Sequence, residues 1–134
     1  MIKDITIPEV KNVTLAVARK RVIGEADEWL VYLINNNDHA IENTLVASKG
    51  YGEKDGEQQK TSTLRHFLET VEPHSATLVE PIDPALFHLA NEYWVSYYID
   101  KQIFDKRFVF VPDSICEENL SFVKELDMEA VLHS

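Results

Sequence analysis

Two segments rich in aromatic and β-branched residues, Asn91 to Ile99 (NEYWVSYYI) and Ile103 to Val111 (IFDKRFVFV), limit the folds that this chain can adopt. Such residues favour β-strands, and the intervening Asp100 to Gln102 has the length of a tight connection. The two segments therefore predict an antiparallel hairpin. Short apolar runs between turn signals recur along the chain, which favours an all-β sandwich or barrel.

Further strands are expected between turns rich in Gly, Asn, Asp and Pro. They cover residues 12–23, 28–35, 41–48, 61–71 and 76–82. Segment 28–35 is apolar on both faces, which indicates a central strand, whereas Pro81 places 76–82 at a sheet edge or ends it. Residues 61–71 could instead form a short helix, and residues 84–90 one helical turn. The polar, glycine-containing residues 49–60 are expected to form a loop or an open hairpin tip.

The pattern changes after Pro112. Ser114 and Glu117 have the spacing of a helical capping box, and acidic residues suit the first turn of a helix. A length of 134 residues fits one domain, in which residues 112–134 form a helical or irregular C-terminal extension. The predicted fold is an immunoglobulin-like antiparallel β-sandwich of about seven strands with a short C-terminal helix. A small closed barrel is the alternative.

Charge and residue usage disfavour several classes of partner. The chain carries 13 basic and 23 acidic residues, a net charge of −10. Nucleic acids and anionic membrane surfaces bind basic patches, so neither is expected as a partner. The single cysteine allows no internal disulfide.

No apolar run reaches the roughly 20 residues of a transmembrane helix, and the N-terminus lacks the pattern of a signal peptide. These features predict a cytoplasmic protein.

Motifs of catalytic, metal and cofactor sites are not found in this sequence. The histidines lack the spacings of zinc sites, and the serines lie outside the nucleophile-elbow pattern. The loop Gly50 to Gly56 departs from the nucleotide-binding glycine pattern, and its acidic side chains would repel phosphate. We therefore expect no catalytic residue, no metal and no cofactor. Carboxylates near the hairpin could form an acid pair, but they are also the expected background of an acidic domain: Glu80, Asp83, Glu92, Asp100 and Asp105.

The predicted hairpin carries the clearest binding signal. Tyr93, Val95 and Tyr97 share one face of its first strand, which we expect in the core, and Trp94 and Tyr98 share the other. Aromatic residues are enriched at protein interfaces, although a loop or the C-terminal helix could cover them. The leading hypothesis is a non-catalytic module that binds a partner protein or assembles as a symmetric homodimer. Its candidate contact residues are Tyr51, Arg65, His66, Trp94 and Tyr98.

Two other hypotheses remain open. The residues also allow a small enzyme or ligand-binding barrel that uses Arg65, His66 and a nearby carboxylate. The segments GYGEKDGEQQKTSTLRHF (Gly50 to Phe67) and NEYWVSYYIDKQIFDKRFVFVPDSI (Asn91 to Ile115) resemble a family of small bacterial proteins without an established activity. Some members carry the label of a phenylalanyl-tRNA synthetase subunit. The resemblance therefore implies, as a further hypothesis, a role related to aminoacyl-tRNA synthetases. The arginines of this chain lie in no ATP-anchoring motif.

Overall fold

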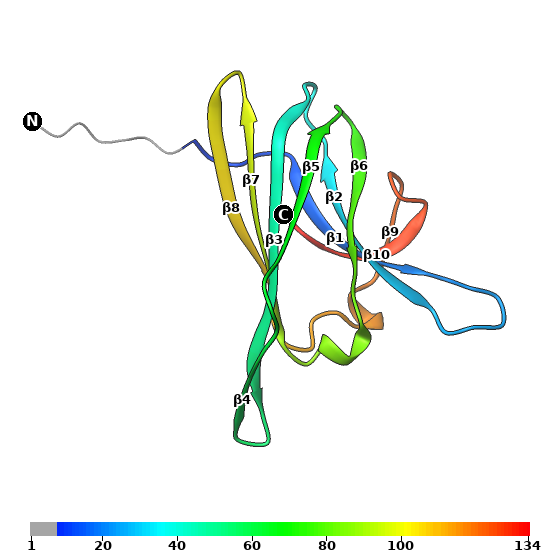
Figure 1. Ribbon diagram of the computed structural model, residues 1–134. Helices are drawn as coiled ribbons and strands as arrows, with labels where there is room; N and C mark the ends of the chain where they lie inside the picture. Colours follow the sequence, from blue (N-terminus) through cyan, green and yellow to red (C-terminus); the bar gives the residue numbers. More distant parts are fainter. Residues whose placement is uncertain (1–7) are drawn as a thin grey trace, which may run out of the picture.

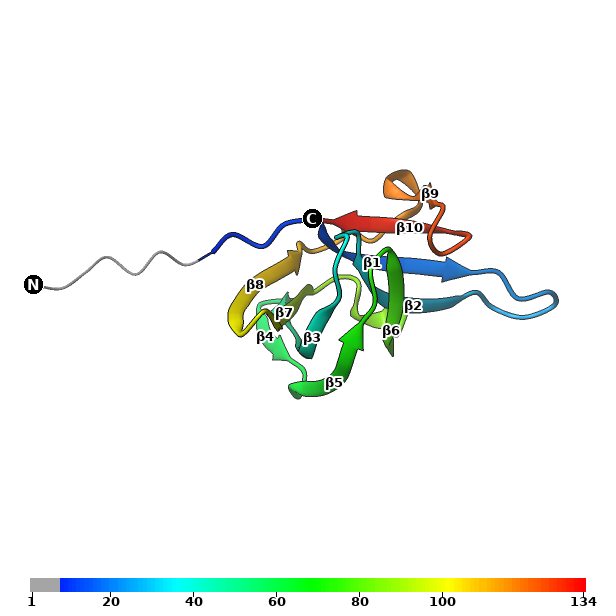
Figure 2. The same ribbon diagram turned by 90° about the horizontal axis from the view of Figure 1, so that it is seen from above.

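A computed structural model describes residues 8–134 of the chain (Figure 1). The N-terminal segment considered for a signal peptide begins with residues 1–7, which lie outside this description. Two antiparallel sheets pack against each other, as predicted for an all-β sandwich, and Figure 2 shows them as two layers. In the part of the chain that the structure describes, no helix is long and apolar enough to cross a membrane.

Sheet A has the spatial strand order β6-β2-β1-β10-β9. Its strands are β1 (Val13–Lys20), β2 (Glu28–Asn35), β6 (Ser75–Pro81), β9 (Ser121–Val123) and β10 (Met128–His133). Sheet B has the order β4-β3-β7-β8, and β5 also pairs with β3. Its strands are β3 (Ile41–Lys54), β4 (Glu57–Lys60), β5 (Leu64–Val71), β7 (Ala90–Ile99) and β8 (Gln102–Phe110). The described chain thus has more strands than the expected seven.

The predicted strand and turn positions agree with most of these bounds. Segment 61–71 contains a strand and not a helix, β6 lies at an edge, and 84–90 begins with the short 3₁₀ helix η1 (Pro84–Leu86). Of the two alternatives for residues 49–60, the hairpin forms and the loop does not, because β3 continues to Lys54 and pairs with β4. Asp55 and Gly56 make the turn with φ angles of 53° and 80°, the left-handed pair that a two-residue hairpin needs. This hairpin projects beyond the rest of sheet B (Figure 1).

The main core lies between the two sheets. Tyr93, Val95 and Tyr97 of β7 are buried there, as expected from their alternation. Leu15 and Val31 contribute from sheet A. The neighbouring residues of β7 point to the other side of sheet B, because successive side chains of a strand face opposite ways.

The C-terminal helix expected within residues 112–134 is not confirmed. Only the three-residue 3₁₀ helix η2 (Glu117–Asn119) forms there, and Cys116 precedes it in an extended conformation without a side-chain cap. The Ser114 hydroxyl is buried and has no hydrogen-bond partner among the described residues, so the capping box is absent. The rest of the segment forms β9 and β10, and β10 pairs with β1 inside sheet A. The segment is therefore part of the sandwich.

The C-terminal segment also covers the outer face of sheet A. Ala16, Ala18 and Ile34 on this face are buried in a second apolar cluster with Val123 of β9. Arg19 of β1 fixes the segment further, since its guanidinium lies 2.7 Å from the Glu117 carboxylate and 3.0 Å from that of Glu129. In Figure 2, β9 lies beyond β10, at the edge of sheet A opposite to β6. This arrangement leaves the outer face of sheet B open.

Candidate functional site

Strand β5 separates two of the predicted site residues. His66 pairs with Val46, which is buried in the core, so both side chains face the interior. Arg65 pairs with Ala47, which lies opposite Trp94 on the other side of the sheet. Arg65 and His66 therefore lie on opposite faces of sheet B, whereas the hypothesis of a small enzyme or ligand-binding barrel used both.

The outer face of sheet B carries a group of exposed apolar side chains, which we call the aromatic face. Phe67 of β5 pairs with Leu45 of β3, and Leu45 pairs with Ser96, which lies between Trp94 and Tyr98 on β7. Residues one rung apart on one face are within reach of large side chains. Trp94 is 47% exposed and Phe67 is 60% exposed. The aromatic face comprises Leu45, Phe67, Trp94, Tyr98 and Ile103.

A buried carboxylate lies beside the aromatic face. Glu92 accepts a hydrogen bond of 3.2 Å from the Tyr51 hydroxyl, and it lies 3.6 Å from Lys49 Nζ and 3.8 Å from Arg107 Nη1. Burial of the phenol, followed by the charge of Glu92, raises the pKa of Tyr51. Tyr51 thus remains a hydrogen-bond donor that holds this end of the outer face in place.

Four of the five predicted contact residues therefore share one side of sheet B. Tyr51, Arg65, Trp94 and Tyr98 face outward, whereas His66 faces inward. In the described chain neither a loop nor the C-terminal segment covers Trp94, which sequence reasoning had left open. The C-terminal segment covers sheet A instead.

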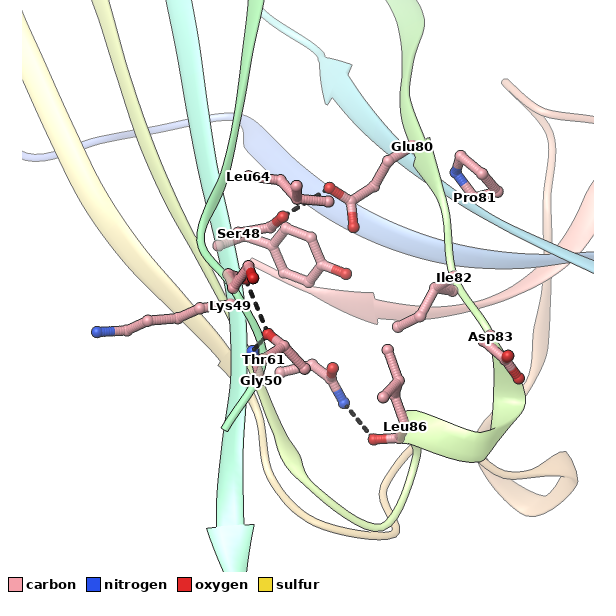
Figure 3. A pocket seen from close by; sticks show the side chains of 13 residues that line it. Ser48, Lys49, Gly50, Thr61, Leu64, Glu80, Pro81, Ile82, Asp83 and Leu86 are labelled. Atoms are coloured by element: carbon pink, nitrogen blue, oxygen red, sulfur yellow. Dashed lines mark hydrogen bonds between the residues drawn. The ribbon is translucent and has the colours of Figure 1, made fainter. Parts of the chain in front are cut away.

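A second feature is a cavity of about 240 Å³ between the two sheets (Figure 3). Its walls come from β3, β5, β6, β7 and η1, together with the connection between β4 and β5. The cavity is lined by Ser48, Lys49, Gly50, Thr61, Ser62, Leu64, Glu80, Pro81, Ile82, Asp83, Leu86, Asn91 and Tyr93.

Glu80 is the most buried carboxylate of this cavity, with 12% of its side chain exposed. It pairs with Val31, whereas Leu78 pairs with Tyr32, so Val79 has no partner on β2 and forms a β-bulge. The extra residue reverses the alternation of β6, because a bulge re-aims the side chains that follow it. Glu80 therefore faces the interior beside Val79 and reaches toward Ser48 (Figure 3).

Two side chains of sheet B hold the Glu80 carboxylate. Ser48 Oγ donates a hydrogen bond of 2.6 Å to Oε1, and His66 Nε2 lies 2.6 Å from the same oxygen. A serine nucleophile requires the histidine between the serine and the acid. Here the carboxylate is central, and both groups bind it directly. The arrangement therefore orients Glu80 and differs from a hydrolase triad.

Within residues 8–134, no three His, Cys, Asp or Glu side chains come together in a group that could hold a metal ion. Sequence reasoning had noted Glu80 only as one of several carboxylates, and it missed Ser48, Asn91 and the bulge. Comparison of the chain with protein families, with curated proteins and with solved structures found no match.

Proposed function

We propose that this chain is a non-catalytic assembly module that forms a symmetric homodimer through the aromatic face of sheet B. The observation that carries the proposal is the cluster of exposed apolar side chains on neighbouring rungs of β5, β3, β7 and β8. Contiguous apolar patches are uncommon on monomers. Aromatic residues at the centre of such a patch are frequent binding hot spots.

Charge favours a second copy as the occupant. The chain has a net charge of −10, so two copies repel each other over most of their surfaces. The outer face of sheet B, however, carries the cations Arg65, Arg107 and Lys49 together with the carboxylates of Glu92 and Asp105. Charges of both signs around an apolar centre can pair across a two-fold axis, because each patch then meets its own complement.

Sheet packing is also compatible with this contact. Stacked β-sheets pack about 10 Å apart through their side chains. The inner face of sheet B already packs in this way on sheet A, and the aromatic face offers side chains of similar kind on the opposite side. Two outer faces in contact would bury Trp94 and Phe67 as Tyr93 and Tyr97 are buried within the chain.

Matched phenylalanine variants test the proposal. Phe122 of β9 is 65% exposed and lies on sheet A, so Phe122→Ala is the control for Phe67→Ala. We expect Trp94→Ala or Phe67→Ala to raise the dimer dissociation constant at least about 30-fold, as loss of a hot spot does. Phe122→Ala should change it by no more than about twofold. Light scattering at increasing concentration measures the constant; equal effects of Phe67→Ala and Phe122→Ala would contradict the proposal.

A further inference from the structure

Three hydrogen-bond donors that line the Glu80 cavity are already used within the protein. Ser48 donates to Glu80, and the Thr61 hydroxyl donates to the Ser62 carbonyl at 3.0 Å. The Asn91 amide nitrogen donates to the carbonyls of Leu86 and Leu89. These three groups are therefore not available as donors to a ligand in the cavity.

Acceptors in the same cavity remain available. Both hydrogen bonds to Glu80 end on Oε1, which leaves Oε2 without a hydrogen bond to a described residue. The bonds of Asn91 use its amide nitrogen and leave the acceptor Oδ1. Because these oxygens can accept hydrogen bonds, they suit a ligand that donates them.

Tyr93 provides a further polar group on the cavity wall. Its side chain is 2% exposed overall and lines the cavity, and its hydroxyl forms no hydrogen bond to another described residue. The oxygen itself is not fully buried and reaches the open space of the cavity, so it can accept a hydrogen bond from a ligand. Burial, with the charge of Glu80 as a second cause, raises the pKa of Tyr93, so the phenol stays protonated.

The charge of the cavity is negative. Glu80 and Asp83 are carboxylates, and the only cationic side chain in the lining is Lys49. Lys49 extends away from Glu80 and Ile82 on the other side of β3 (Figure 3), where its Nζ lies 3.6 Å from Glu92. A cationic ligand would therefore meet the carboxylate of Glu80, which has Ser48 and His66 on Oε1 and no lysine or arginine of the described residues beside it.

We propose that this cavity binds a small primary ammonium compound, whose N–H groups donate to Glu80 Oε2, Asn91 Oδ1 and the Tyr93 hydroxyl. Leu64, Ile82 and Leu86 form the apolar part of the wall and would contact a short alkyl chain. A volume of about 240 Å³ suits a ligand smaller than the drug-sized molecules of larger pockets. The site lies between the sheets and is independent of the aromatic face.

Three probes with similar chains and different charges test the ligand class. The ¹⁵N-labelled full chain is titrated with n-butylammonium chloride, butan-1-ol and sodium butyrate, with potassium chloride as the salt control. We expect saturable amide shifts at Gly50, Leu64 and Leu86 with butylammonium, and none at Gly56 in the distant β3–β4 turn. Butanol should bind at least about tenfold more weakly, and butyrate should not bind, because the carboxylate of Glu80 attracts only the cation.

Two variants test the residues. Glu80→Gln keeps an oxygen that can accept from Ser48 and His66 but loses the charge, and it should weaken butylammonium binding at least about tenfold. Tyr93→Phe should weaken it about threefold or more. Glu125→Gln, an exposed change in the β9–β10 turn, is the control and should have no effect.

The outcomes separate the two proposals. Equal binding of butylammonium and butanol, a similar response to potassium chloride, or full affinity in Glu80→Gln would overturn the ammonium site. The comparison of the three probes uses only the wild-type chain, so it tests the ammonium site even if a variant fails to fold. Dimer formation should be the same in Glu80→Gln as in the wild type, since that side chain faces away from the aromatic face.

Discussion

Glu80 lies opposite Val31 across β6 and β2, and both side chains face the interior of the sandwich. A regular strand would have placed Glu80 on the other side from Val79, since side chains alternate. The bulge at Val79 thus brings a carboxylate to the inner face of β6. The two hydrogen bonds from Ser48 and His66 compensate for its burial.

Removing the Glu80 carboxyl group should destabilise the fold. Glu80→Ala leaves Ser48 and His66 without their acceptor and is expected to lower the free energy of unfolding by about 1–3 kcal/mol. Glu80→Gln keeps an acceptor and should cost less than about 1 kcal/mol. Urea unfolding measures both, with Glu125→Ala as an exposed control. Equal stability of Glu80→Ala and the control would argue against the bulged geometry.

Asn35 connects β2 with the turns at the same end of the sandwich. Its fully buried amide donates to the carbonyls of His39, Val71 and Glu72, and its Oδ1 accepts from the backbone N–H of Asn37. Asn35→Ala would leave these buried backbone groups unpaired, and we expect a loss of about 3 kcal/mol. Asn36→Ala, at an exposed neighbour, is the control. A loss below that of the control would show that water replaces the amide.

Buried tyrosines should make the protein sensitive to alkali. Burial raises the pKa of Tyr97 to about 12, above the value of about 10 in an unfolded chain. Above pH 10 the unfolded chain therefore binds fewer protons than the folded one, and stability falls by about 1.4 kcal/mol per pH unit for each such tyrosine. Unfolding measured at rising pH should be less steep in Tyr97→Phe. The same slope in the variant and the wild type would contradict this assignment.

Much of the fold could be predicted because its strands follow local rules. The alternation of Tyr93, Val95 and Tyr97 against Trp94 and Tyr98 predicts which face of β7 is buried, and the structure agrees. The predicted C-terminal helix is not confirmed, for a physical reason. Leu120, Val123 and Leu126 have helical spacing, yet β10 gains backbone hydrogen bonds on both sides, from β1 and β9. Pairing with distant strands outweighed local preference.

The cavity residues could not be predicted in the same way. Ser48, Glu80 and Asn91 come from three strands that meet only in the sandwich. The bulge at Val79 depends on the register between β6 and β2, which no local signal in β6 specifies. The Asp55–Gly56 turn, by contrast, has a known hairpin signature, and a hairpin was one of the two alternatives predicted for residues 49–60.

The oligomeric state of the wild-type chain tests the central claim most directly. Sedimentation equilibrium across the micromolar range, at moderate salt, gives the mass of the species in solution. The account predicts a concentration-dependent rise from the 15.4 kDa monomer to twice that mass, and a shift of this rise to higher concentration in Trp94→Ala. A wild-type chain that stays at the monomer mass across the whole range would contradict it.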